Sequence, residues 1–346
     1  MSTSSTAPAP QQLPPDAHVL SIVTGAWTSA AVYVAAKLGI ADLLKDGPRS
    51  AEFLSVATST HEVSLYRLLR ALVSAGIFTE TDDRTFSNTP ASDTLREDHP
   101  NSTRPMVIWI NEPQHWNVYG ELLHSVRTGE PAWDKYHGEP VFPYLFRTNP
   151  ELGHIFNKAM TSYTRQTTEP LLQAYDFSQA ETIADIGGGL GHLLAEILNA
   201  NPRAKGILFD LAEVLQGAPE MLDSYGVADR AELVIGDFTK SIPVSADIYL
   251  LKHIIHDWYD DKNQVILRNI RENMTEAAKI LIIETVIPPG NEPHFSKIID
   301  LEMLAAPGGM ERTAAQFEKL LADSGLKLTR IIPTNGIMSI IEAAIA

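Results

Sequence analysis

The chain has 346 residues, of which 44% are hydrophobic and 20% charged, so it is long enough for two domains of an ordinary soluble protein. It contains no cysteine, which excludes disulfides, thiolate nucleophiles and zinc–thiolate sites and fits a reducing cytoplasm. The net charge of -16 argues against a surface that follows nucleic-acid phosphates and favours a small-molecule substrate. No apolar run approaches the roughly 20 residues of a membrane span, so no membrane partner is expected.

The N-terminal part of the chain is predicted to hold a tail and a helical domain. Residues 1–17 are rich in Ser, Thr, Ala and Pro, lack the pattern of a signal peptide and are predicted to be disordered. Within the domain of residues 18–104, segment 18–46 is apolar on more than one helical face and needs a cover, from its own domain or from a second copy of the chain. Further helices and a hairpin over residues 77–87 indicate a winged helix. Acidic residues outnumber basic ones over residues 49–98, so DNA binding is not expected.

Residues 105–170 are rich in aromatic side chains and are predicted to form a helical cap over the substrate. Glycine and proline divide this stretch into several helices joined by short loops. Most of its aromatic side chains are expected in the core. A minority, together with Met160, is expected to line a pocket for a flat aromatic substrate, and Trp116 and Phe156 belong to this aromatic set.

The remaining segment, residues 171–346, is predicted to fold as a doubly wound α/β sheet, because apolar strands alternate with helices. Its last two apolar runs, 326–333 and 338–345, are separated by Thr-Asn-Gly, which predicts a hairpin and one reversed strand at the end of the sheet. The apolar runs that precede them lie at 182–186, 206–209, 232–235, 247–251 and 280–287.

A glycine-rich turn directly follows the first of these strands. It contains Gly187 to Gly189, and a helix is expected to begin near His192. The next strand ends in Asp210, roughly 20 residues further on, where a carboxylate suits a ribose diol. The dinucleotide pattern GxGxxG fails, because its last position is His192 or Leu194. Since glycines let a ligand lie against bare main chain, the ligand is expected to be a nucleoside without a pyrophosphate.

Two further strand ends carry candidate functional residues. Asp237 and Phe238 follow the third strand, where the carboxylate could accept from an adenine amino group and the ring could stack on the base. His256 follows the fourth strand and is a candidate general base, because an imidazole of pKa about 6.5 can take the proton of a phenol of pKa about 10. The acids placed to orient this imidazole are Glu284, Glu311 and Asp257.

A metal site is the other chemistry that these histidines suggest. His253 and His256 are three residues apart and could mimic a metal-binding pair. No third ligand has a helpful spacing, and both histidines fall at a strand-to-loop transition. No metal is therefore expected.

Three motifs together resemble the small-molecule O-methyltransferase family, which includes plant caffeic acid and flavonoid O-methyltransferases and bacterial polyketide and phenazine methyltransferases. The turn Asp185-Ile-Gly-Gly-Gly-Leu-Gly191 resembles the first motif of S-adenosylmethionine-dependent methyltransferases. The other motifs are Lys252 with His256-Asp257-Trp258, and Gly308-Gly-Met-Glu-Arg-Thr313. The resemblance covers nearly the whole chain.

The resemblance implies a fold, a cofactor and a site. It implies a Rossmann-like domain that binds S-adenosyl-L-methionine and a winged-helix N-terminal domain that forms a homodimer and contributes to the partner's substrate pocket. His256 would be the base, flanked by Glu284 and Glu311. Positions that match those packing against the acceptor ring are Phe156, Met160 and Met303. Positions that match cofactor contacts are Asp185, Gly187, Gly188, Gly189, Asp210, Leu211, Asp237, Phe238 and Lys252.

The chain also departs from this family. Between Met303 and Gly308 it reads Leu-Ala-Ala-Pro, one residue shorter than the plant members and without their polar pair, so the plant acceptors do not transfer. His253 replaces the usual aromatic residue. Some members have lost methyl transfer and do other chemistry with the cofactor bound, and the intact His256 argues against that here.

The sequence therefore predicts a metal-independent transfer of a methyl group to a hydroxyl, expected to be phenolic, on a small aromatic secondary metabolite. Two alternatives stay open: a cofactor-bound relative that catalyses hydroxylation or rearrangement, and a winged-helix regulator that senses a metabolite. The identity of the acceptor, the regiochemistry and the choice among O-, N- and C-methylation stay open as well.

Overall fold

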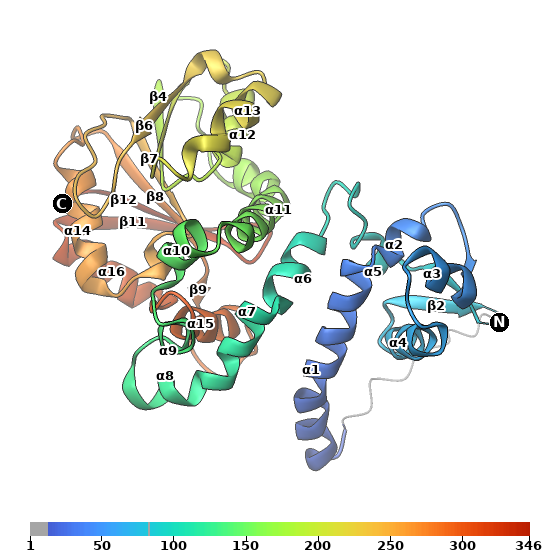
Figure 1. The fold of residues 1–346 in the computed structure, drawn as a ribbon. Coiled ribbons are helices and arrows are strands. Elements are labelled where there is room, and N and C mark those ends of the chain that lie inside the picture. Colours follow the sequence, from blue (N-terminus) through green and yellow to red (C-terminus); the bar gives the residue numbers. More distant parts are fainter. Residues whose placement is uncertain (1–12, 82–83) are drawn as a thin grey trace, which may run out of the picture. The chain divides into compact units, whose positions relative to one another are not determined.

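The computed structural model describes residues 13–81 and 84–346, and the chain divides into two compact units after Asn111. In the first unit, helices pack against a small antiparallel sheet of strand order β1-β3-β2 (Figure 1). Phe78–Thr81 (β2) and Thr85–Asn88 (β3) pair as the predicted hairpin, and Arg49–Ser50 (β1) pairs with β3. The helices are α1 (Pro15–Lys37), α2 (Ile40–Leu43), α3 (Ala51–Ala57), α4 (Glu62–Ser74), α5 (Pro90–Asp93) and α6 (Arg104–Asn111).

Helix α1 differs from the prediction in two ways. It begins at Pro15, inside the segment predicted to be a disordered tail, of which residues 1–12 lie outside the described residues. It also reaches a mean hydropathy of 1.6 over 18 residues, so by length and composition alone it could cross a membrane, contrary to the expectation from sequence. Small residues interrupt its large apolar ones, which is why no continuous apolar run stands out. Only 11% of that window is buried, so most of its apolar side chains lack a cover within the described chain.

The second unit is built on a seven-stranded sheet of order β11-β12-β8-β7-β4-β5-β6. Neighbouring strands run parallel except at β12, which is antiparallel to both β8 and β11, as predicted for a reversed last strand. The carboxyl ends of the parallel strands meet at one edge, where ligands bind in such sheets. The strands are β4 (Thr182–Ile186), β5 (Lys205–Asp210), β6 (Ala231–Ile235), β7 (Ile248–Lys252), β8 (Lys279–Glu284), β11 (Leu326–Pro333) and β12 (Ser339–Ile345).

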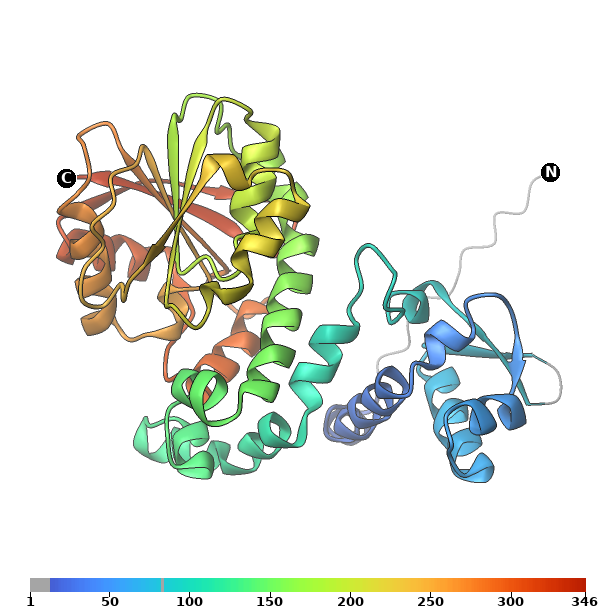
Figure 2. The same ribbon diagram turned by 45° about the horizontal axis from the view of Figure 1, so that its top comes forward.

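Helices cover both faces of this sheet (Figures 1 and 2). One face packs against α11, α12 and α13 through side chains such as Leu194 and Leu222, and the other against α14 and α16 through Ile266 and Phe317. All four of these side chains are at most 1% exposed, so both layers hold the sheet and the loops at its edge. The helices are α11 (Pro150–Ala174), α12 (His192–Ala200), α13 (Ala218–Ser224), α14 (Asp260–Arg271) and α16 (Ala314–Asp323).

Short helices occupy most of the segment predicted to be a cap. They precede α11, and two of them, α8 and α9, pack against α15. The parallel pair of Val286–Ile287 (β9) and Arg312–Thr313 (β10) lies outside the main sheet. The helices and turns of the cap segment are α7 (Pro113–Trp116), η1 (Asn117–Glu121, 3-10), α8 (Leu122–Thr128), α9 (Ala132–His137), α10 (Val141–Pro143) and η2 (Tyr144–Thr148, π-helical). Outside this segment, the second unit also contains α15 (Ser296–Ala305) and the 3-10 turns η3 (Leu215–Gly217), η4 (Ala228–Arg230) and η5 (Ile255–Asp257).

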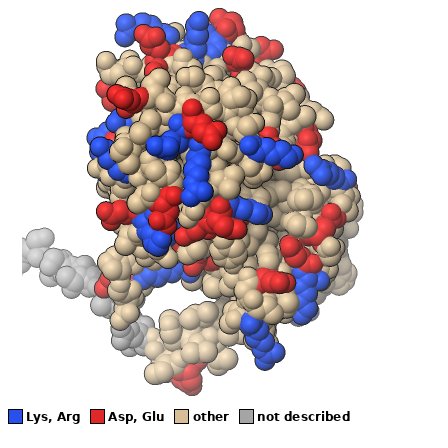
Figure 3. Space-filling view, turned by 90° about the vertical axis from the view of Figure 1, so that its left-hand side faces the viewer, with Lys and Arg blue, Asp and Glu red and all other residues tan. Residues whose placement is uncertain are grey.

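The charged side chains of the described residues are mixed by sign on the face drawn in Figure 3. Lys and Arg lie among Asp and Glu there, and no extended patch of one sign forms among the described residues on this face. A phosphate-tracking surface would need such a basic patch.

Candidate active site

The glycine turn after β4 leaves main chain open at the carboxyl edge of the sheet. Gly187, Gly189 and Gly191 have φ values of 70, 62 and 83°, in the left-handed region that favours glycine. A Cβ on Gly188 would lie 2.6 Å from the Asp185 carboxyl group, so a side chain there would force its neighbours to shift. A Cβ on Gly189 would meet nothing within 4 Å, so its main chain borders open space.

Asp210, at the end of β5, holds this turn in place. Its carboxylate accepts from the main-chain N–H of Gly189 at 2.9 Å and of Leu211 at 2.7 Å. Burial raises the pKa of Asp210 to about 6, and the two main-chain hydrogen bonds oppose that rise. A carboxylate has about four acceptor positions, so two remain for a ligand that carries hydroxyl groups.

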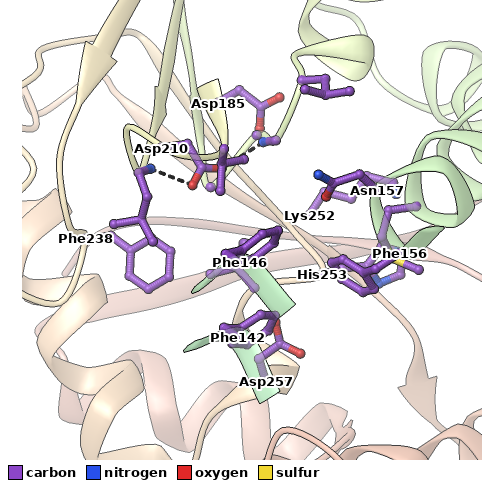
Figure 4. Close-up of a pocket in the computed structure, with 18 of the residues that line it drawn as sticks. Phe142, Phe146, Phe156, Asn157, Asp185, Asp210, Phe238, Lys252, His253 and Asp257 are labelled. Atoms are coloured by element: carbon purple, nitrogen blue, oxygen red, sulfur yellow. Dashed lines mark hydrogen bonds between the residues drawn. The ribbon is translucent and has the colours of Figure 1, made fainter. Parts of the chain in front are cut away.

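A cavity of about 640 Å³ opens beside the turn, within the second unit (Figure 4). Its wall includes all the residues predicted to contact the cofactor, and Phe156 and Met160 of the predicted acceptor set. Figure 4 shows Phe142 and Phe146 close to each other in this cavity. The volume falls within the range of small-molecule sites.

The half-buried Lys252 and the buried Asp185 are two oppositely charged groups on this wall. The Lys252 ammonium donates to Thr164 Oγ1 at 3.1 Å. Burial lowers the pKa of Lys252 to about 7 and raises that of Asp185 to about 7, and each charge partly offsets the shift of the other. Both groups therefore titrate near neutrality and respond to any charge that a ligand brings.

Asp237 and Phe238 lie after β6 in a turn. Asp237 Oδ1 accepts from the N–H of Thr239 at 3.0 Å and from its hydroxyl at 2.6 Å. Burial raises the pKa of Asp237, but these hydrogen bonds and Lys240 outweigh it, so the pKa is lowered overall. The Phe238 ring lines the cavity 6.4 Å from the Trp258 ring. Asp237 and Phe238 thus present a charged carboxylate and an aromatic face to a ligand.

His256 lies in a buried group of acids just beyond the cavity wall. Its ring Nδ1 lies 2.7 Å from Glu311 Oε1, and its main-chain N–H donates to Glu284 Oε1 at 2.9 Å. Asp257 Oδ1 lies 3.6 Å from the ring Nε2. The sequence left Glu284 and Glu311 as equal candidates to orient the ring. In the structure Glu311 contacts the ring and Glu284 contacts the main chain.

Glu311 is itself held from two sides. The Thr285 hydroxyl donates to its Oε2 at 2.6 Å, and Asp300 accepts from its main-chain N–H at 2.8 Å. Glu311 precedes the cap Thr313 of α16 and therefore lies outside that helix.

The acids raise the basicity of His256. Burial alone lowers its pKa, but the hydrogen bond to Glu311 and the charges of Asp257, Glu284 and Glu311 raise it to about 9. Burial also raises the pKa of Asp257 and of Glu284 to about 7, against the opposing charge of His256. Because these groups interact strongly, their protons are shared and the cluster titrates as a unit.

Several predicted site residues lie outside the cavity wall. His256 is 6% exposed, and Glu284 and Glu311 are buried behind it. Met303 is buried in α15, and Trp116 is half-buried at the end of α7. The wall includes Asp257 and His253 but none of these five residues, so the acceptor contacts predicted for Trp116 and Met303 stay a prediction.

Other wall residues were not singled out from the sequence. On α11, Asn157, Thr161 and Thr164 share the cavity with Phe156 and Met160, at the three- and four-residue spacing of one helical face. That spacing is a signal in the sequence from which these wall residues could have been predicted. Among the described residues, no group of three or more His, Asp or Glu side chains is placed to hold a metal ion.

Comparison with known proteins identifies the family. The O-methyltransferase domain matches residues 119–327, and the O-methyltransferase dimerisation domain matches residues 20–98. The chain belongs to the O-methyltransferase family. It is an S-adenosylmethionine-dependent methyltransferase, which confirms the predicted family and cofactor. The dimerisation match covers the exposed apolar helix α1 from residue 20 onward.

The matches to individual relatives extend over nearly the whole length of both chains. The chain is 44% identical over 331 residues to the phenazine O-methyltransferase PhzM of Lysobacter antibioticus, with 96% of each chain covered. It is 37% identical to the 8-amino-8-demethylriboflavin N,N-dimethyltransferase of Streptomyces davaonensis, with 90% of each covered. The crystal structure of CalO1, a methyltransferase in calicheamicin biosynthesis in its SAH-bound form, superposes with a TM-score of 0.85 at 34% identity, covering 97% of this chain and all of that one.

Proposed function

We propose that this enzyme methylates a phenolic hydroxyl of a small aromatic compound, with His256 as general base and without a metal. The observation that carries the proposal is the buried imidazole just beyond the cavity wall. Its Nδ1 lies 2.7 Å from Glu311 Oε1, and its Nε2 lies 3.6 Å from Oδ1 of Asp257, which is part of the wall. A base must reach the hydroxyl from the side opposite its orienting acid, and this arrangement leaves Nε2 for that purpose.

The cavity residues fit S-adenosylmethionine. Asp210 keeps acceptor positions for a ribose diol, and the bare main chain at Gly189 borders open space. Asp237 and Phe238 offer an acceptor and an aromatic face to adenine. When bound, the cofactor supplies an electrophilic methyl group.

The chain's own residues would position and deprotonate the acceptor. The Phe142, Phe146 and Phe156 rings would hold a flat ring and exclude water. His256 Nε2 would take the hydroxyl proton. The Glu311 carboxylate would fix the proton on Nδ1 and stabilise the imidazolium, while Glu284 holds the main chain of His256.

The dimerisation domain suggests the assembly. Val19, Ile22, Val23 and Trp27 of α1 are between 59 and 75% exposed in one chain. We propose that a second copy of the chain covers this apolar face in a homodimer, so that protein and not a membrane surrounds α1. A dimeric enzyme without cysteines that acts on a small metabolite fits the cytoplasm.

An amine acceptor is the second candidate, because a relative at 37% identity is named an N,N-dimethyltransferase. One matched pair of probes, 2-naphthol and 2-naphthylamine, separates the two candidates with methyl-labelled cofactor. If 2-naphthol is converted to a labelled methyl ether, the proposal is supported. If label appears only in methylated 2-naphthylamine, the enzyme is an N-methyltransferase instead. Conversion of a substrate without label transfer would instead support the hydroxylation or rearrangement that the sequence left open.

A further inference from the structure

His253 has an unusual backbone conformation at the wall of the cavity. It follows β7 directly and has a φ of 57°, in the left-handed region that non-glycine residues rarely adopt. The other described non-glycine residues with positive φ, Ser59 and Arg84, lie in the first unit. Backbone strain of this kind persists where the surrounding structure fixes it, and such places cluster at ligand sites. His253 is one of the residues that line the cavity (Figure 4).

Two buried polar atoms at this place have no hydrogen-bond partner among the described residues. They are His253 Nε2 and the Tyr163 hydroxyl, and their rings lie 5.3 Å apart. His253 lines the cavity, whereas Tyr163 lies next to it without forming part of the wall. Burial, with the charges of Lys252 and His256, holds the pKa of His253 well below its usual value. Burial and the Glu311 charge raise the pKa of Tyr163 to about 12, so Tyr163 keeps its proton. A neutral imidazole and a phenol can each donate and accept, and buried groups of this kind normally have a partner.

The His253–Tyr163 pair lies close to His256, the proposed base for the reacting hydroxyl. The His253 ring lies 5.0 Å from the His256 ring. Two oxygens on neighbouring ring carbons lie about one hydrogen-bond length apart. An acceptor whose hydroxyl reaches His256 therefore brings a substituent on the neighbouring carbon toward His253. A substituent further around the ring points elsewhere.

We propose that His253, with Tyr163 beside it, binds a second polar group of the acceptor, on the carbon next to the one that carries the methylated hydroxyl. This inference rests on the proposed function, and it specifies the acceptor class as vicinally substituted aromatic compounds.

The test compares 2,3-dihydroxynaphthalene with 2,7-dihydroxynaphthalene, two isomers in which only the place of the second hydroxyl differs. Two quantities are measured on the full-length enzyme: the Kd of each isomer for the complex with S-adenosylhomocysteine, and kcat/KM for methylation. The variants are Tyr163→Phe, which removes one hydroxyl, and His253→Phe, which keeps a ring. The control is Tyr175→Phe, because that hydroxyl donates to Glu342 at 3.0 Å outside the cavity.

The wild type should prefer the 2,3-isomer by about tenfold or more, and each site variant should lose most of that preference. The Tyr175→Phe variant should keep it. Equal affinity of the wild type for the two isomers would overturn the inference, as would an unchanged ratio in Tyr163→Phe, since the buried atoms would then be satisfied by water alone. If neither isomer is methylated but the binding preference and its loss are observed, the proposed reaction fails and the binding inference stands.

Discussion

Replacing Glu311 with Gln should move the pH dependence of methyl transfer. The Glu311 carboxylate lies 2.7 Å from His256 Nδ1 and is the first of the contributions that raise the pKa of His256 to about 9. A hydrogen bond to a charged group contributes about 1.5–3 kcal/mol. At about 1.4 kcal/mol per pKa unit, its loss should lower the pKa of His256 by roughly one to two units.

The direction follows from the role of the base. The imidazole accepts a proton only when neutral, so kcat/KM should rise with pH through the pKa of His256 and level off above it. Glu311→Gln lowers that pKa, so the rising limb should move to lower pH. The plateau should also fall, because a weaker base transfers the proton less readily and the neutral amide stabilises the imidazolium less.

The assay is kcat/KM from pH 6 to 10 with methyl-labelled cofactor and a phenolic acceptor. Glu342→Gln is the matched control, because Glu342 is another buried carboxylate, on β12, paired with Arg330 rather than with His256. The reasoning would be refuted if the rising limb of the kcat/KM profile stayed at the same pH in Glu311→Gln, or if it moved equally far in the Glu342→Gln control.

Three further predictions concern the cofactor site and the assembly. Gly188→Ala should weaken S-adenosylhomocysteine binding at least about tenfold and lower Tm, because its Cβ would lie 2.6 Å from the Asp185 carboxyl group; calorimetry with wild-type Kd and Tm would contradict this. Asp210→Asn should raise the Kd of the same ligand about tenfold or more, since it removes the charge expected to accept from the ribose, and an unchanged Kd would remove that role. Val23→Asp puts a charge on a side chain that is 62% exposed on α1 and should yield monomers in light scattering, whereas a dimer mass would place the interface elsewhere.

The glycine turn could be predicted from the sequence because its constraints are local. Positive φ at Gly187 and Gly189 requires glycine, and Asp210 at the next strand end carries the acceptor that fixes the turn. Parallel strands bring their carboxyl ends to one edge, so the order of elements also brought Lys252 and Asp237 to the same cavity.

Other features depend on contacts between distant segments. Glu284 and Glu311 both follow in the chain after His256, and only side-chain placement decides that one meets the ring and the other the main chain. Aromatic content alone could not separate wall residues such as Phe142 from core residues such as Trp133, which is fully buried. The apolar character of α1 is spread around the helix among small residues, so it is evident as a mean hydropathy and not as a run.

The most direct test of the central claim is a single-turnover measurement of label transfer from methyl-labelled S-adenosylmethionine to a phenolic acceptor, with the wild type and His256→Ala both saturated with cofactor. The wild type should place the label in an aryl ether. The variant should bind the cofactor with the same Kd and transfer the label at least about 100-fold more slowly. Equal single-turnover rates for the two proteins, or no labelled ether from the wild type, would contradict the assignment of His256 as the base for phenolic methylation.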